Sequence, residues 1–443
     1  MPEYNAPLRD MRFVMDELLD MTGSYAAYGL EDATPDLVSA ILEEGAKFTN
    51  QVLSPLNRTG DEEGCHIDNG VVTTPKGFKE AYQAYCENGW GSMTASPEYG
   101  GQGLPSSLGL IIAEMVASAN YSFSMYPGLS HGCAAAIAAH GTTEQKDLYL
   151  NKLTPGTWTG TMCLTEPHCG TDLGLVKTRA VPQADGTYKV TGTKIFISCG
   201  EHDMSENIVH LVLAKLPDAP AGTKGISLFI VPKFLPDANG EVGERNSLVC
   251  GSIEHKMGIK ASATCVMNFD DATGFLIGEV NKGWTYAKFL LGNERLGAPR
   301  VGSSQAKLEQ LKEIAKERIV RGKPLWDHPR FRDKYVEAQV ELKALEMTVM
   351  RVLSSMQAGA DQSKPDPATS VIKIKGAQMV QRMTELFVEM AGEQALPWAD
   401  GEEGDNARIG PYWAERAAPN YFNYRKSSIY AGSDQGQKGI ISK

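Results

Sequence analysis

The pattern of apolar residues changes twice along this chain of 443 residues, and this change limits the fold more than any other feature. From residue 8 to about 153, apolar residues recur at three- and four-residue spacing, which predicts helices. Between about 158 and 275 the pattern becomes short β-rich runs separated by Gly, Pro and Asp, which predicts a small domain of about seven strands. Helical spacing returns from Trp284. The sequence therefore predicts an α+β protein with a β domain between two helical regions.

Local patterns predict individual elements within these regions. The predicted strands include residues 188–191, 194–198, 208–213, 226–231 and 264–269. A glycine-rich turn is predicted at 96–103, a small-residue helix at 131–140, a loop at 357–369 and an amphipathic helix at 371–390. The clearest helical stripe comprises Ala338, Leu342, Leu345, Val349, Val352 and Met356. Its alternating four- and three-residue spacing is typical of a helix face that packs into a core.

Composition and charge exclude several classes of protein. The formal net charge of -11 gives no general positive field for a nucleic acid. The longest apolar run, near 108–119, is interrupted by Glu114 and is too short to cross a bilayer. The eight cysteines form no CxxC pair and no zinc-like Cys/His spacing, so we expect reduced thiols and no metal site. The N-terminal residues carry charges where a signal peptide is apolar, so we expect a cytoplasmic protein.

Two segments of the β region are candidates for chemistry: Met-Cys-Leu-Thr-Glu-Pro-His-Cys-Gly-Thr-Asp at 162–172 and Lys-Ile-Phe-Ile-Ser at 194–198. The residues alone are compatible with an ordinary turn and an edge strand, since Thr, Gly and Asp are common in turns. They are equally compatible with a strand and a glycine turn that present backbone N–H groups and hydroxyls to a planar, anionic or amide-rich cofactor.

Several ordered signatures resemble those of the acyl-CoA dehydrogenase family. TEPHCGTD resembles the family's TEPxxGSD, and IFIS stands where the family has a W-I-T or F-I-T strand beside the flavin ring. PEYGGQG resembles PExYGGxG, HGTTEQKDLYLNKLTPG resembles HGTxEQKxxYLPxLxxGE, and EHKMGIKASATC resembles xxKMGxxxSxTC. These signatures occur in the family's order over most of the chain.

The resemblance implies a fold and a set of ligands. The expected fold is a helical N-terminal domain at 1–157, a middle β-barrel-like domain at 158–280 and a C-terminal four-helix bundle at 281–443. FAD is expected between the last two domains and across a subunit contact. An acyl-CoA substrate, an electron-transfer flavoprotein as acceptor and a homotetramer are implied, with a homodimer or mixed tetramer as alternatives.

The resemblance also implies which residues contact FAD. The implied contacts are Cys163, Leu164, Thr165, Gly170, Thr171, Phe196, Ile197, Ser198, Arg318, Ser433 and Gln435. Arg318 matches the arginine that meets the FAD pyrophosphate across the dimer, a charge-assisted bond that is chemically reasonable. The residues after it, IVRGK, depart from the family's K-T-F-G, so a solvated arginine at a helix end is the alternative.

The catalytic base requires a different position from the usual one. Many members use the glutamate of a Y-E-G-T motif, but this chain has Ala431 there, and alanine cannot accept a proton. A second branch of the family places its glutamate before an arginine on the first C-terminal helix, where this chain has Glu294 and Arg295. We therefore expect Glu294 to be the base, with a surface ion pair as the alternative.

Three further roles follow from the same resemblance. The backbone N–H of Ala431 is expected to polarise the thioester carbonyl, together with a ribityl hydroxyl of FAD. Arg295 matches a residue near the CoA moiety, and the hydroxyl of Thr171 is expected near the thioester.

The two halves of the chain resemble different members of the family. Residues 1–282 are most similar to long members such as 3-methylmercaptopropionyl-CoA dehydrogenases, and 283–443 to shorter ones such as the large subunit of pimeloyl-CoA dehydrogenase. The acyl group therefore stays open. The alternatives in function are a flavin-binding relative with other chemistry, such as a desulfinase or oxidase, and a non-catalytic partner subunit.

Overall fold

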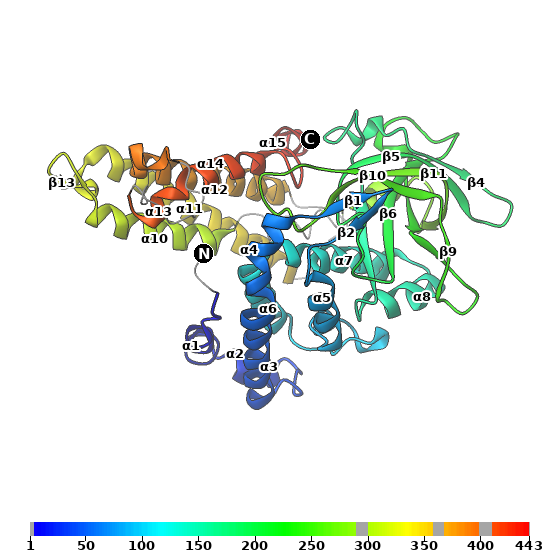
Figure 1. The fold of residues 1–443 in the computed structure, drawn as a ribbon, viewed down its shortest axis with the longest axis horizontal. Helices are drawn as coiled ribbons and strands as arrows, with labels where there is room; N and C mark the ends of the chain where they lie inside the picture. Colours follow the sequence, from blue (N-terminus) through cyan, green and yellow to red (C-terminus); the bar gives the residue numbers. More distant parts are fainter. Residues whose placement is uncertain (1–3, 289–299, 358–366, 398–409, 443) are drawn as a thin grey trace. The chain divides into compact units, whose positions relative to one another are not determined.

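The computed structural model describes residues 4–288, 300–357, 367–397 and 410–442 (Figure 1). The chain divides into two compact units, Met1–Ala287 and Lys288–Lys443. The first unit combines helices and a sheet, and the second is mainly helical.

The first unit begins with helices, as predicted. They are α1 (Leu8–Arg12), η1 (Phe13–Leu18), α2 (Met21–Ala27), α3 (Pro35–Phe48), η2 (Thr49–Leu53), α4 (Ser54–Glu63), α5 (Phe78–Glu87), η3 (Pro97–Tyr99), α6 (Ser106–Ala119), α7 (Tyr121–His140) and α8 (Thr143–Leu153). The sequence defines several starts: Thr142 and Gln145 form a capping box at α8. The buried side chains of Leu108, Met115 and Phe123 belong to the helical core.

A small hairpin in this region was not predicted. Strands β1 (His66–Asp68) and β2 (Val71–Thr73) pair antiparallel around Asn69 and Gly70. Both turn residues have positive φ, 49° and 80°. An Asn-Gly pair between short alternating runs is a strong hairpin signal, so the prediction of helices alone was wrong here.

A seven-stranded sheet follows, as predicted. Its strands are β3 (Trp158–Cys163), β4 (Arg179–Pro182), β5 (Tyr188–Ser198), β6 (Asn207–Lys215), β7 (Ile226–Pro232), β10 (Leu248–Ile253) and β11 (Thr264–Ile277). The order is β10-β11-β5-β4-β6-β3, and β7 pairs with both β11 and β6. The sheet therefore closes on itself through β7, which agrees with the expected β-barrel-like form. The 3-10 turns η4 (Leu173–Leu175) and η5 (Gly222–Gly225) and the hairpin of β8 (Phe234–Pro236) and β9 (Val242–Arg245) complete the region.

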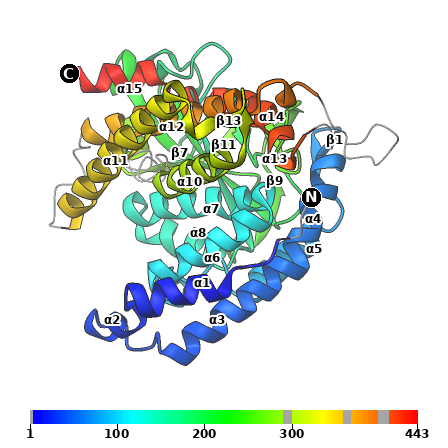
Figure 2. The ribbon, with the colours of Figure 1, turned by 90° about the vertical axis from the view of Figure 1, so that its left-hand side faces the viewer.

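Helix α7 connects the helices with the sheet. It contacts α6 and α8, which lie beside it in Figure 2. It also packs against β3. The backbone of β3 approaches α7 closely, because a Cβ atom added to Gly160 would lie 2.3 Å from the Cβ of Cys133. A side chain at this position would separate the helix from the strand.

The predicted strands differ from the observed ones in extent. The runs at 188–191 and 194–198 are parts of one strand, β5, and the run at 264–269 is the first part of β11. Strands β3, β4 and β10 were not among the predicted runs. Thr and Gly in β3 and Gly and Ser in β10 weaken the alternation of apolar and polar residues on which the prediction relied, and β4 has only four residues.

The second unit consists mostly of helices. Its elements are α10 (Val301–Glu317), β12 (Ile319–Val320), β13 (Lys323–Pro324), η6 (Leu325–Asp327), α11 (Pro329–Gln357), α12 (Pro367–Ala391), η7 (Gly392–Ala395), α13 (Tyr412–Glu415), α14 (Ala417–Tyr424), η8 (Arg425–Ser428) and α15 (Asp434–Ile441). Ala338, Leu342, Leu345 and Val352 are buried, which confirms the predicted core face of α11.

Helix α12 begins at Pro367 rather than at residue 371, since proline is favourable in the first helical turn. Most of the predicted loop at 357–369 lies outside the described residues. Among the described helices of both units, none combines the length and apolar character needed to cross a membrane.

Candidate functional site

The segment after β3 forms a tight turn. The N–H of Glu166 donates to the carbonyl of Cys169 (2.8 Å), and the N–H of Cys169 donates back to the carbonyl of Glu166 (3.1 Å). Pro167 and His168 form the tip of the turn between them. The two hydrogen bonds fix the position at which the chain continues into Gly170.

The Glu166 side chain anchors this turn to the sheet. Its carboxylate accepts hydrogen bonds from the N–H of Lys177 (2.8 Å), the N–H (3.0 Å) and hydroxyl (2.6 Å) of Thr178, and the ammonium of Lys194 (2.8 Å). The side chains of Glu166 and Lys194 are only 3% and 0% exposed. A buried charge requires such compensation, so the geometry makes this ion pair a structural centre of the turn.

The pKa values of this pair have opposing causes. Burial raises the pKa of Glu166, but Lys194 and the hydrogen bonds overcome it, so the pKa of this carboxyl lies below its usual value. Burial lowers the pKa of Lys194, although Glu166 acts in the opposite direction. The lowered pKa of Glu166 favours an ionised carboxylate at neutral pH beside the Lys194 ammonium.

The turn also contacts the second candidate segment directly. The N–H of Ile195 donates to the carbonyl of Thr165 (2.9 Å), and the ammonium of Lys194 donates to the carbonyl of Leu164 (3.1 Å). The two segments that the sequence suggested as parts of one site therefore lie side by side.

Phe196, in the second segment, has an unusual conformation. Its φ is +59° and its side chain is 58% exposed. The pairing of β5 with β11 is irregular here, because the register shifts between Cys265 and Met267. An L-residue in the left-handed region costs about 1–2 kcal/mol, and an exposed aromatic ring gains little from burial. These two features together are typical of a binding position.

The neighbouring candidates differ in accessibility. Ile197 is buried, and the Cys163 thiol is buried beside the Thr161 hydroxyl (3.6 Å). The side chains of these two candidates therefore face the core, and only their backbones could contact a ligand. Ser198 pairs with Thr264 at the end of the strand.

Gly170 and Thr171 are exposed on the turn. A Cβ atom added to Gly170 would lie 3.0 Å from the methyl group of Thr165, which is closer than such contacts usually are. Glycine therefore lets the chain pass close to Thr165, at the start of the signature.

A second group of candidates forms a turn in the other unit. Ala431 and Gly432 have φ values of +53° and +89°. Ser433 is the N-cap of α15 and accepts from the N–H of Gly436 (3.2 Å), whereas Gln435 is exposed. The turn therefore presents the strained backbone at Ala431 immediately before a capped helix.

Lys373 of α12 holds this turn from inside. Its ammonium donates to the carbonyl of Ser427 (3.0 Å) and to the Asp434 carboxylate (3.2 Å). The Lys373 side chain is 2% exposed. Because both partners flank residues 428–433, one buried cation restrains both ends of the turn.

Arg318, at the end of α10, interacts within its own unit. Its guanidinium donates to the Gln394 side-chain oxygen (2.7 Å) and to the Ala391 carbonyl (3.1 Å). Its Nε atom is buried without a hydrogen-bond partner among the described residues. This arrangement differs from the alternative of a solvated arginine. Glu294 and Arg295 lie outside the described residues.

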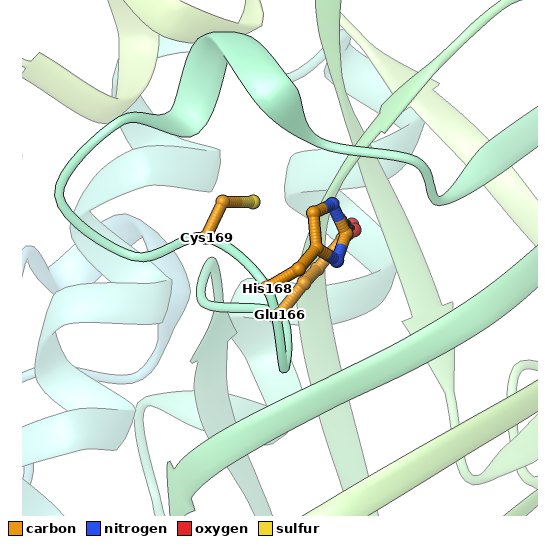
Figure 3. Close-up of side chains that lie close together, drawn as sticks. All are labelled: Glu166, His168 and Cys169. Carbon is orange, nitrogen blue, oxygen red and sulfur yellow. Dashed lines mark ion pairs between the residues drawn. The ribbon is translucent and has the colours of Figure 1, made fainter.

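A third feature was missed by the sequence prediction. The side chains of Glu166, His168 and Cys169 each place one possible metal-ligand atom within 4.8 Å of the others (Figure 3). The spacing of Cys and His along the chain does not reveal this group, because the turn brings Glu166 next to residues two and three positions later. All eight cysteines lie in the described residues, and all are free thiols as expected.

The anchoring residues were also missed. Lys194 and Lys373 are buried cations in otherwise apolar surroundings, and neither was selected from the sequence. A lysine that interrupts an apolar strand or helix face was the available signal, but the same pattern is also usual for solvent-exposed positions.

Comparison with known proteins identifies the family. Residues 38–157 match the acyl-CoA dehydrogenase N-terminal domain, 161–272 the middle domain and 281–443 the C-terminal domain. The 3-methylmercaptopropionyl-CoA dehydrogenase of Ruegeria pomeroyi is 44% identical over 323 residues, covering 71% of this chain and 54% of that protein. A butyryl-CoA dehydrogenase of Syntrophomonas wolfei is 38% identical, covering 62% of this chain and 46% of that protein. The chain thus spans about half the length of these curated relatives.

Solved structures show the same fold. Butyryl-CoA dehydrogenase from Megasphaera elsdenii matches with a TM-score of 0.67 at 24% identity, covering 92% of this chain and 97% of that one. Acyl-CoA dehydrogenase from Geobacillus kaustophilus matches with a TM-score of 0.70 at 24% identity, covering 91% and 97%. The three family models match the chain in the same order as the signatures, and the solved structures have the same fold. The chain therefore belongs to the acyl-CoA dehydrogenase family.

Proposed function

We propose that this chain catalyses the FAD-dependent α,β-dehydrogenation of an acyl-CoA thioester to the trans-2-enoyl-CoA. The main support is the junction of the two signatures, in which Thr165 and Ile195 share a backbone hydrogen bond beside the exposed Phe196. An ordinary turn and edge strand would not explain an exposed aromatic residue in the left-handed region at this junction.

The described residues fit FAD in both units. In the first unit, Gly170 is exposed on the turn beside Thr165, and the exposed Phe196 ring is available to a planar ring system. In the second unit, the buried Nε of Arg318 has no hydrogen-bond partner among the residues that the structure describes, and it is available to donate to a pyrophosphate oxygen. We propose that Leu164, Thr165, Thr171, Ser433 and Gln435 complete the contacts, with Cys163, Ile197 and Ser198 contributing through the strands.

A side chain of the protein removes the α proton of the substrate. Glu294 accepts the proton from the α carbon, because the usual glutamate position is occupied by Ala431. FAD, when bound, supplies the acceptor for the hydride that leaves the β carbon. The N–H of Ala431 donates to the thioester oxygen as negative charge develops there, and Arg295 and Thr171 lie near CoA and the thioester.

The backbone at Ala431 supports this role. Lys373 restrains the turn on both sides, so the N–H direction is fixed before substrate binds. A donor fixed in advance needs no reorganisation during the reaction, which is the main advantage of such groups in catalysis.

The decisive test is Glu294→Gln, with Glu309→Gln as the matched control on an exposed part of α10. Enoyl-CoA formation is measured with an artificial electron acceptor over a panel of acyl-CoA thioesters. We expect at least a 100-fold lower kcat for Glu294→Gln, since general-base catalysis contributes about 10²–10⁴-fold. Flavin absorbance should be unchanged in both variants. Unchanged turnover in Glu294→Gln would remove this residue as the base.

The alternative chemistries give other products in the same assay. An oxidase would consume oxygen without the artificial acceptor, and a desulfinase would release sulfur as an oxyanion without net reduction of the flavin. A non-catalytic partner subunit is favoured by the missing glutamate at Ala431, and it would show no turnover with any thioester.

We further propose that the protein is a cytoplasmic homotetramer. Its electrons pass to an electron-transfer flavoprotein. Assembly is supported by large apolar side chains of α11 that its own unit leaves exposed, of which Val336, Val340 and Met347 lie opposite the core face. The exposed side chains are Val336, Val340, Met347, Met350 and Leu353. Exposed large apolar side chains gathered on one helix are typical of a contact between subunits. Light scattering of the purified protein separates the tetramer from a homodimer, and co-expression tests a mixed tetramer.

A further inference from the structure

The turn at 165–172 carries two polarisable side chains at the positions that the family signature leaves open. In TEPHCGTD these positions are His168 and Cys169. The paired backbone hydrogen bonds of Glu166 and Cys169 bring the carboxylate next to both side chains. A carboxylate, an imidazole and a thiol within 4.8 Å of one another form a ligand set that the proposed dehydrogenation does not use.

The distances are close to those of a tetrahedral metal site. His168 Nε2 lies 3.7 Å from Glu166 Oε2. Bond lengths of about 2.0–2.3 Å at a tetrahedral zinc ion place two ligand atoms roughly 3.4–3.6 Å apart. The imidazole and the carboxylate therefore need almost no movement. The Cys169 sulfur lies within 4.8 Å of the other two ligand atoms and needs a shift of about 1 Å, which a χ1 rotation of roughly 35° within its rotamer well supplies.

Free acceptor positions decide whether a cation can enter. Lys194 and Thr178 occupy Glu166 Oε1. Within the described part of the chain, Oε2 accepts a hydrogen bond only from the N–H of Lys177 and so keeps one lone pair. His168 Nε2 now bonds to the carbonyl of Leu175 (2.9 Å), and the ring is partly exposed. A cation would replace this single surface hydrogen bond and leave the buried ion pair in place.

We propose that Glu166, His168 and Cys169 bind a thiophilic divalent cation of the zinc class, with solvent at the fourth position. The Cys169 thiol loses its proton to solvent when its sulfur bonds to the metal, and no oxidation or reduction occurs. One open position is typical of metal sites with three protein ligands. Lys194 lies beside the same carboxylate, so the site should bind the cation reversibly rather than hold it permanently.

Cadmium is the probe, because its bond to a thiolate gives an ultraviolet charge-transfer band. The purified full-length chain is titrated with Cd²⁺, and Zn²⁺ is then added as competitor. We expect one equivalent of Cd²⁺ per chain to produce the band and Zn²⁺ to displace it. Cys169→Ser should lose the band, and His168→Ala should weaken Cd²⁺ binding at least tenfold. Cys86→Ser is the matched control, because Cys86 is a half-buried thiol outside the group.

Two further measurements keep the test decisive. Zn²⁺ should raise the Tm of the wild-type chain and of Cys86→Ser but not of Cys169→Ser, which also shows that the variants fold. Binding should strengthen as pH rises, because burial and Glu166 raise the pKa of the Cys169 thiol that must be deprotonated. A missing band in the wild type, or an unchanged band in Cys169→Ser, would overturn the proposal. None of these readouts depends on dehydrogenase activity.

Discussion

Glu166→Gln is the substitution for which the structure gives the largest expected loss of stability. The amide removes the negative charge but leaves the Lys194 ammonium, 0% exposed, with only the Leu164 carbonyl and a neutral oxygen. Removing one partner of a buried ion pair costs about 3–5 kcal/mol, because the remaining charge stays desolvated. We therefore expect the free energy of unfolding to fall by about that amount.

A double-mutant cycle separates the pair from the rest of the site. Lys194→Met fills a similar volume without charge, so Glu166→Gln combined with Lys194→Met should be less destabilised than the sum of the single variants by at least about 1 kcal/mol. Glu241→Gln is the control, since its bond to Lys152 (2.7 Å) is at the surface. Breaking an exposed pair should cost less than about 1 kcal/mol.

Urea unfolding followed by circular dichroism and fluorescence is the assay, with free energies fitted only where the two transitions coincide. The stability that Glu166 contributes also depends on pH, because the pKa of its carboxyl is lowered in the folded state. Its contribution to the free energy of unfolding is complete above the unfolded pKa of about 4.3 and is lost as pH falls through the folded pKa. The difference in free energy of unfolding between the wild type and Glu166→Gln should therefore be constant near neutral pH and become smaller in acid. A loss below about 1 kcal/mol at pH 7, or strict additivity in the cycle, would refute this account.

Three further outcomes are expected. Phe196→Gly should stabilise the FAD-free chain by about 1 kcal/mol, since glycine tolerates its φ of +59°, while FAD affinity falls in a fluorescence titration. Gly170→Ala should lower FAD affinity about tenfold or more, because the added Cβ lies 3.0 Å from the methyl group of Thr165, a proposed FAD contact, and would displace it. An unchanged affinity would show that FAD does not approach this part of the turn closely. Glu294→Gln combined with Ala431→Glu should recover part of the lost turnover by supplying a carboxylate at the family's usual position, and no recovery in a folded, yellow variant would contradict it.

The sequence predicted the order of helical and β regions because periodicity depends on neighbouring residues alone. The pairing of residues 165 and 195, and the closure of the sheet through β7, depend on contacts between distant residues, and the family resemblance supplied what periodicity could not. The ion pair of Glu166 and Lys194 was not predicted, since a lysine within a strand is usually exposed. The roles of Glu294 and Arg295, the other cofactor contacts and the three-domain boundaries stay predictions.

Two of the candidate residues share a property that bears on function. Phe196 and Ala431 are both non-glycine residues with positive φ, at +59° and +53°. Each conformation costs about 1–2 kcal/mol, and glycine would remove most of that cost. Each residue also lies beside a buried cation, Lys194 or Lys373, that ties the adjoining backbone to a carboxylate.

These anchors explain how the strain persists. A strained backbone relaxes unless the surrounding structure determines it, and a buried ion pair provides that restraint on one side of each residue. Removing the restraint at Lys373 should therefore affect the direction of the Ala431 N–H before it affects the overall fold. If Lys373→Met kept both the folded state and full turnover, the turn would not need this anchor, and the argument that strain at Ala431 serves the thioester would lose its physical basis.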